Sequence, residues 1–190
     1  MILQKYNPYK SFRDGQEKAI QQMIDLYEKG QKVIELNAPT ASGKTVSLYV
    51  FGRVLEKELG LKKVMFTSPQ VALIESGNLF DLPKLVGKRN YKCRAIDGYT
   101  AEDCPFSNKD EGFVACEKCS YRLAKYAFKN SDFGAVTFKR YLVDPSIYSV
   151  TKGLVIDESS ELEGQLLDNS TIDLDLNVNA ITKKRRPSEQ

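Results

Sequence analysis

"KVIELNAPTASGKT", residues 32–45, is the stretch that decides the fold. Its apolar run, 32–36, predicts a buried strand, and the helical pattern of residues 45–59 follows it and ends before Gly60. Between them, residues 38–45 match the pattern G-x-x-x-x-G-K-[ST], with Ala38 in place of the first glycine. Strand, loop and helix in this order indicate a phosphate-binding loop.

The chemistry of that loop survives the change at Ala38. Backbone N–H groups that curl around a phosphate, an ammonium and a hydroxyl are what the loop must supply. Lys44 would neutralise the β- and γ-phosphates, and the Thr45 hydroxyl would ligate Mg²⁺. A Gly-Lys helix start without any ligand is the alternative. The predicted nucleotide-binding residues of the loop are Pro39, Thr40, Ala41, Ser42, Gly43, Lys44 and Thr45.

The second half of such a site is an acid at the end of another buried strand. "GLVIDESS", residues 153–160, supplies Asp157 to hold Mg²⁺ and Glu158 to orient and deprotonate the attacking water. An Asp-Glu pair alone more often marks a helix start, where it faces the helix dipole. With Lys44, these two acids form the predicted catalytic set. Upstream, Gln16 carries an amide that can recognise the edge of adenine.

The remaining periodicity predicts an α/β fold with a parallel sheet. An amphipathic helix is expected over residues 14–29, with Asp14 and Glu17 as a capping box. At 190 residues and 42% hydrophobic, the chain can bury one core and carry a small insertion. Further strands are predicted at 62–68, 133–138 and 153–157, and further helices from Pro69 and over 120–131.

Four cysteines stand apart from this pattern: Cys93, Cys104, Cys116 and Cys119, in a chain without histidine. No secretory signal or membrane-spanning stretch is evident, so we expect an intracellular protein whose clustered thiols bind metal. Only "CEKC", 116–119, has a generic metal-ligand spacing, and a Cys₄ site suits zinc and an iron–sulfur cluster equally. The net charge of +3 does not identify a polyanionic partner.

The order of these motifs resembles the iron–sulfur DNA helicases of superfamily 2, the XPD/DinG type. "SFRDGQ" (11–16), "APTASGKT" (38–45), "FTSPQ" (66–70) and "VIDESS" (155–160) are similar to the family's Q-motif and motifs I, Ia and II. The segment from "GKRNYKC" (87–93) to "CEKC" is similar to its cluster domain. The resemblance implies a RecA-like P-loop sheet with helices on both faces and a small four-cysteine Fe–S insertion.

In function, the resemblance implies ATP hydrolysis coupled to translocation on single-stranded DNA and unwinding of a forked duplex. The four cysteines would then ligate a [4Fe–4S] cluster, with zinc as the weaker alternative. The implied domains are residues 1–81 and 126–181 for the two parts of the RecA-like domain, 82–125 for the insertion and 182–190 for a basic tail. The implied DNA contacts are Thr67, Ser68 and Gln70, together with Lys88, Arg89 and Tyr91 beside the first cysteine.

Three features depart from the family. Ala41 stands where a glycine is usual in the loop, Ser159-Ser160 stand where Ala-His usually follow the acidic pair, and Phe138 stands where an asparagine is common. These 190 residues also include no second RecA-like domain, so we expect that domain, in cis or in trans, to supply the arginine that completes hydrolysis. A chain on its own would hydrolyse ATP poorly. The alternative is a nucleotide-responsive DNA-binding or interaction module without helicase activity.

Overall fold

The computed structural model describes residues 3–75, 81–104, 119–161 and 164. The chain divides into two compact units, Met1–Ser159 and Ser160–Gln190, and the fold below is that of the first unit. Among the described residues, no helix is long and apolar enough to cross a membrane.

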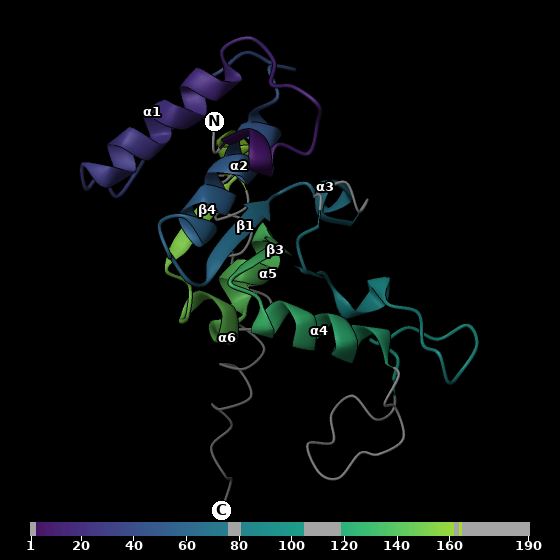
Figure 1. Ribbon diagram of the computed structural model, residues 1–190. Helices are drawn as coiled ribbons and strands as arrows, with labels where there is room; N and C mark the ends of the chain where they lie inside the picture. Colours follow the sequence, from purple (N-terminus) through teal and green to yellow (C-terminus); the bar gives the residue numbers. More distant parts are fainter. Residues whose placement is uncertain (1–2, 76–80, 105–118, 162–163, 165–190) are drawn as a thin grey trace, which may run out of the picture. The chain divides into compact units, whose positions relative to one another are not determined.

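A four-stranded parallel sheet organises this unit, as the sequence predicted (Figure 1). Its order is β2-β3-β1-β4, and all the pairings between these strands are parallel. Met65 of β1 lies opposite Gly134 of β3 and Leu154 of β4. Because the strands run in one direction, their carboxyl ends share one edge of the sheet, where α/β proteins bind their ligands. The strands are β1 (Val64–Ser68), β2 (Lys84–Leu85), β3 (Phe133–Thr137) and β4 (Gly153–Ile156).

Helices and 3₁₀ turns connect the strands. The α-helices are α1 (Gln16–Glu28), α2 (Lys44–Lys57), α3 (Val71–Glu75), α4 (Ser120–Asn130), α5 (Phe138–Val143) and α6 (Pro145–Tyr148). The 3₁₀ turns are η1 (Leu3–Tyr6), η2 (Lys88–Asn90) and η3 (Ser159–Glu161).

The two faces of the sheet are covered by different helices. Side chains alternate along a strand, so Val64 and Phe66 of β1 join one buried cluster while Met65 joins the other. The first cluster contains the apolar faces of α1 and α2, and the second contains side chains of α4 and α6. Helices therefore lie on both faces, which confirms the predicted α/β class.

Close contact between α2 and the sheet depends on a glycine. A Cβ on Gly52 would lie 2.4 Å from the Phe133 ring of β3, a distance that real side chains do not adopt. The ring itself is buried at 1% exposure. Gly52 thus lets α2, whose first residue is Lys44, lie directly against the strands.

Three sequence predictions need correction. Residues 32–36 form no strand: Val33 is 88% exposed, and only Ile34 and Leu36 pack partly against the core. The predicted capping box is wrong, because Gly15, with φ of 79°, is the N-cap of α1 and no side chain caps it.

The third correction concerns short elements. β2, α5 and α6 were not predicted, although the Asp144 side chain accepts from Ser146 N at the start of α6, with Pro145 as its first residue. The helix predicted from Pro69 is described only as α3, and its continuation through residues 76–80 lies outside the described residues.

Candidate nucleotide site

The loop of residues 38–45 turns sharply into α2. Ser42 N donates to the Pro39 carbonyl at 3.3 Å, and Gly43 is the N-cap of α2 with φ of 87°. Ala41 has φ of 62°, a left-handed conformation that residues with a Cβ rarely adopt. The Ser42 hydroxyl is buried without a hydrogen-bond partner. A loop of this kind opening a helix is a ready anion site, because free N–H groups and the helix dipole face the same way.

Lys44 and Thr45 place their polar groups at this turn. Lys44 Nζ donates to the Ala38 carbonyl at 3.1 Å, so the ammonium folds back over the loop. Thr45 Oγ1 donates to Asp157 Oδ2 at 2.7 Å, across 112 residues of sequence. The structure therefore brings together the two residues that the sequence assigns to Mg²⁺.

The acidic pair lies where β4 ends. Asp157 N donates to the Thr67 carbonyl at 2.9 Å, which extends the pairing of β4 with β1 by one residue and fixes the acid. Asp157 is only 2% exposed. Glu158 has φ of 56°, and its N–H donates to Asp157 Oδ1 at 3.2 Å. Strained backbone of this kind is concentrated at functional sites, where surrounding contacts maintain it.

Gln16 contacts the loop directly. Its Nε2 donates to the Gly43 carbonyl at 2.9 Å, and its Oε1 accepts from Arg13 N at 2.7 Å. The side chain is 7% exposed. In this structure both ends of the amide are bound by backbone, so its adenine role stays a prediction.

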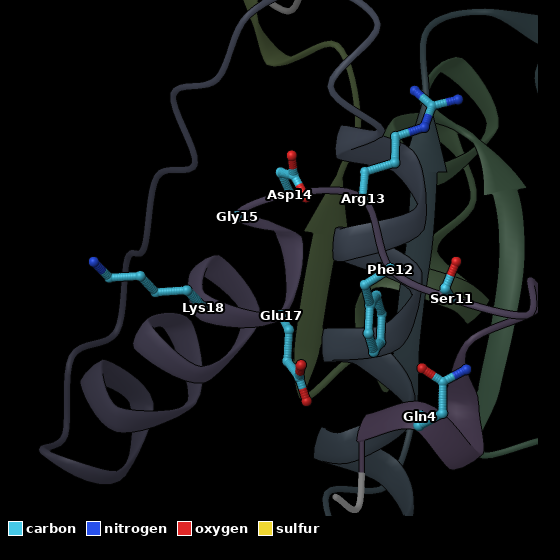
Figure 2. A pocket seen from close by; sticks show the side chains of 8 residues that line it. All are labelled: Gln4, Ser11, Phe12, Arg13, Asp14, Gly15, Glu17 and Lys18. Carbon is cyan, nitrogen blue, oxygen red and sulfur yellow. The ribbon is translucent and has the colours of Figure 1, made fainter.

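A pocket of about 500 Å³ lies beside this contact (Figure 2). Its volume falls in the range of small-molecule sites, about 300–1,000 Å³. Figure 2 shows the Phe12 ring within the lining and Arg13 and Lys18 extending to opposite sides. The lining residues are Gln4, Ser11, Phe12, Arg13, Asp14, Gly15, Glu17 and Lys18.

Sequence reasoning missed this pocket and the role of Arg13. Arg13 Nη1 donates to the Ala41 carbonyl, so a second side chain of the "SFRDGQ" stretch contacts the loop. A basic residue three positions before Gln16 was the available signal, and Phe12 beside it was another.

The residues predicted to contact DNA are divided between surface and interior. Thr67 and Ser68 are fully buried in β1, whereas Gln70 is exposed. Tyr91 points inward: its hydroxyl accepts from Val86 N at 3.2 Å, and its ring meets Tyr121 edge-on at 5.4 Å. Thr67 and Ser68 are thus buried side chains, whereas Tyr91 is half-buried.

Lys88 and Arg89 lie on η2 at the surface next to this interior. Lys88 Nζ stands 5.9 Å from the centre of the Tyr121 ring, and Arg89 is exposed. Tyr126 of α4 is 72% exposed, a ring at the surface that the sequence reasoning did not select.

Cys93, Cys104 and Cys119 are half-buried free thiols, and Cys116 lies outside the described residues. Cys93 N donates to the Tyr99 carbonyl at 2.8 Å, and Cys119 precedes α4 as its N-cap. The Ser120 hydroxyl donates to the Lys92 carbonyl at 3.0 Å, so the neighbours of the first and last cysteines are in contact. In the described parts of the chain, no three His, Cys, Asp or Glu side chains are grouped closely enough to hold a metal.

The comparisons with known proteins give one family. The family described as type III restriction enzyme, res subunit, matches residues 9–133, from the "SFRDGQ" stretch through the phosphate loop and the cysteines to the start of β3. No curated protein and no solved structure matches.

Proposed function

The chain belongs to the type III restriction enzyme res subunit family, whose domain is of the superfamily 2 helicase type, and on this premise we propose that it is the ATP-binding first motor domain of an iron–sulfur DNA helicase of the XPD/DinG type. Membership of a helicase family supports ATP-dependent motor activity in general. The DNA substrate, the cluster and the assignment of individual residues are the proposed part.

The observation that best supports the assignment as a motor domain is the hydrogen bond of 2.7 Å from Thr45 Oγ1 to Asp157 Oδ2. It joins the phosphate loop to the acid after β4, although these two segments are 112 residues apart in the sequence. A hydroxyl beside a buried carboxylate offers the hard oxygen atoms that Mg²⁺ selects. The Lys44 ammonium lies on the same loop, and phosphate oxygens would replace the Ala38 carbonyl as its partner.

The same geometry suggests how the bound nucleotide would be oriented. The triphosphate would lie on the loop of residues 38–45, and the base would enter the pocket lined by Phe12 and Arg13. The aromatic ring offers stacking for a purine, and Gln16 stands between pocket and loop. Glu158 would orient the attacking water at the carboxyl edge of the sheet.

The proposed cluster would be held by Cys93, Cys104, Cys116 and Cys119. Thiolates are the ligands that iron–sulfur clusters take, and the contact between Ser120 and Lys92 brings the outer two positions into one neighbourhood. A bound cluster would supply a rigid crosslink to residues 82–125, the proposed insertion. That crosslink matters because few apolar side chains are buried among the described residues of this stretch: Leu82, Leu85, Val86, Ala101 and Tyr121.

Single-stranded DNA or a forked duplex would pass along the surface near η2. Lys88 and Arg89 supply positive charge there, and Gln70 is exposed after β1. A second RecA-like domain, in cis or in trans, would close over the nucleotide and supply the arginine that stabilises the transition state.

The test is phosphate release from the chain assembled with its second RecA-like domain, with and without single-stranded DNA. We expect DNA to stimulate release, Glu158→Gln to retain ATP binding and lose hydrolysis, and the surface control Glu28→Gln on α1 to behave as the unchanged chain. Absence of DNA stimulation would instead support the nucleotide-responsive interaction module. Iron analysis of anaerobically purified protein tests the cluster separately, and zinc without iron would exclude it.

A further inference from the structure

The phosphate loop contains two residues with positive φ, and only one of them is a glycine. Gly43, at 87°, adopts this conformation without steric cost, whereas Ala41, at 62°, carries a Cβ that opposes it. The alanine is also exposed, so packing does not hold it in place. Something else must favour the left-handed conformation at position 41.

The stretch of residues 13–16 binds the carbonyl groups of both positive-φ residues. Arg13 Nη1 donates to the Ala41 carbonyl, and Gln16 Nε2 donates to the Gly43 carbonyl at 2.9 Å. The two side chains are themselves connected, because Gln16 Oε1 accepts from Arg13 N at 2.7 Å. One short segment therefore contacts the loop at both of its unusual residues.

These contacts have a definite effect on the loop's donors. In an anion-binding turn the backbone N–H groups converge on the anion, and the carbonyls of the same peptides point elsewhere. A donor that occupies a carbonyl fixes the plane of its peptide. At Ala41 the N–H of that peptide, on Ser42, donates to the Pro39 carbonyl at 3.3 Å, so Arg13 helps to hold the turn itself. At Gly43 the N–H of that peptide belongs to Lys44, the first residue of α2, and a helix offers its first N–H groups to an anion. A flip of the peptide after Ala41 would move its carbonyl away from Arg13 and would lose a charge-assisted hydrogen bond.

We propose that Arg13 is a positioning residue of the phosphate loop, which holds Ala41 in the conformation that a glycine would adopt unaided. The proposal rests on the proposed nucleotide function and adds a dependence that is particular to this chain. With glycine at position 41, the loop has no steric penalty to overcome, so the contribution of Arg13 should largely disappear. The effect of Arg13 on phosphate binding is therefore conditional on the residue at position 41.

A double-mutant cycle on the full 190-residue chain tests this dependence. The variants are Arg13→Ala, Ala41→Gly and the two combined, and the control is Lys10→Ala, which removes an exposed cation that does not line the pocket. Binding of Mg²⁺-ATP and of Mg²⁺-tripolyphosphate is measured by calorimetry. Tripolyphosphate has no base, so it reports on the loop alone.

We expect Arg13→Ala to weaken the binding of both ligands by about tenfold, which corresponds to the loss of one charge-assisted hydrogen bond. In the Ala41→Gly background the same change should cost less than about twofold, since the steric penalty is gone. Lys10→Ala should leave both affinities unchanged, and thermal unfolding without ligand should show that every variant still folds cooperatively.

Two results would overturn the proposal. Equal losses in the alanine and glycine backgrounds would show that Arg13 does not act through Ala41. A loss for ATP but not for tripolyphosphate would show that Arg13 contacts the base instead. Failure of the unchanged chain to bind ATP is a different result, because it removes the proposed nucleotide function before any variant is compared.

Discussion

The nucleotide end of the sheet and the cysteine segment, residues 93–119, are built in different ways. At the nucleotide end, Thr45 in the first turn of α2 contacts Asp157 directly after β4, and both elements pack in the core. Lys44 and Gln16 are likewise bound to the loop. Packing of α2 and of Val155 in β4 against the core thus positions these side chains.

The cysteine segment is held mainly at its two ends. Beside Cys93, Ala101 N donates to the Tyr91 carbonyl at 2.8 Å, and both residues pack against the second core with Cys119. Between these ends, the described residues offer mostly exposed side chains. The difference teaches that the first site depends on packing, whereas the second would obtain its structure from the group it binds, as small metal sites do.

The largest expected effect comes from Cys93→Ser. Loss of one thiolate should remove the proposed cluster, with its visible absorption and its iron, because an alkoxide is not an available ligand at neutral pH. Hydrogen exchange of residues 91–104 should rise, while affinity for Mg²⁺-ATP changes by less than about twofold, since local opening need not spread through a domain.

The matched control is Ser107→Ala, a polar position between the second and third cysteines that is not a proposed ligand. It should retain the full iron content. If Cys93→Ser also abolished ATP binding, the two regions would not be independent and the comparison would fail.

The reverse experiment is Lys44→Ala. We expect it to weaken the binding of Mg²⁺-ATP by about a hundredfold, because about 2.7 kcal/mol of charge-assisted hydrogen bonding to the phosphates is lost. Iron content should be unchanged, since the ammonium donates to the Ala38 carbonyl within the loop rather than to the cysteine segment as far as that segment is described. Calorimetry and iron analysis of the same preparation check both halves, with Lys57→Ala at the far end of α2 as the charge control. Undiminished ATP affinity would remove Lys44 from the site.

A smaller effect is expected at the contact that joins the ends of the cysteine segment. Ser120→Ala removes the hydroxyl that donates to the Lys92 carbonyl, a contribution of about 0.5–1.5 kcal/mol. The cluster should still form, but oxygen or a chelator should bleach it several times faster. Ser131→Ala is an informative comparison, because its hydroxyl bonds Phe128 at the opposite end of α4. Equal bleaching rates in the two variants would mean that the Ser120 contact has no role in holding the cluster.

The same division explains how much the sequence could predict. β1 and β3 were predicted because their apolar runs are buried between two layers of helices, and β4 because its apolar run places Val155 in the core. The helices α1, α2 and α4 were predicted because their apolar faces repeat at helical spacing. "KVIEL" carries the same apolar signal but forms no strand, since a strand also needs a partner, which sequence periodicity does not specify.

Within the site, the motif residues Lys44, Thr45 and Asp157 could be selected from their pattern. The contact of Arg13 with Ala41 could not, because it depends on how a surface segment crosses the loop. The inward contacts of Tyr91 were missed for a related reason: its basic neighbours indicated a surface, while its half-buried ring packs against the second core.

The smallest effect concerns acid stability and compares two carboxyl groups. Burial opposes ionisation of Asp81, but hydrogen bonds from Tyr49 and Arg53 of α2, with the charge of the guanidinium, bring its pKa below the usual 3.8. The pKa of Asp103, in the cysteine segment, is lowered chiefly by hydrogen bonds from the side chain and backbone of Thr100.

A carboxyl whose pKa is lower in the folded state stabilises the fold above its unfolded pKa, and this stabilisation is lost as pH falls through the folded value. Below about pH 4, the unchanged chain should therefore lose the Asp81 contribution, which is less than about 1 kcal/mol because the side chain is 74% exposed. Asp81→Asn should flatten the decrease in unfolding free energy between about pH 5 and 3. Asp103→Asn should leave global unfolding unaltered, because its partner lies in the same loop rather than on a packed helix. Equal flattening by both variants would show that the cysteine segment unfolds together with the sheet, and the two regions would then share one cooperative structure.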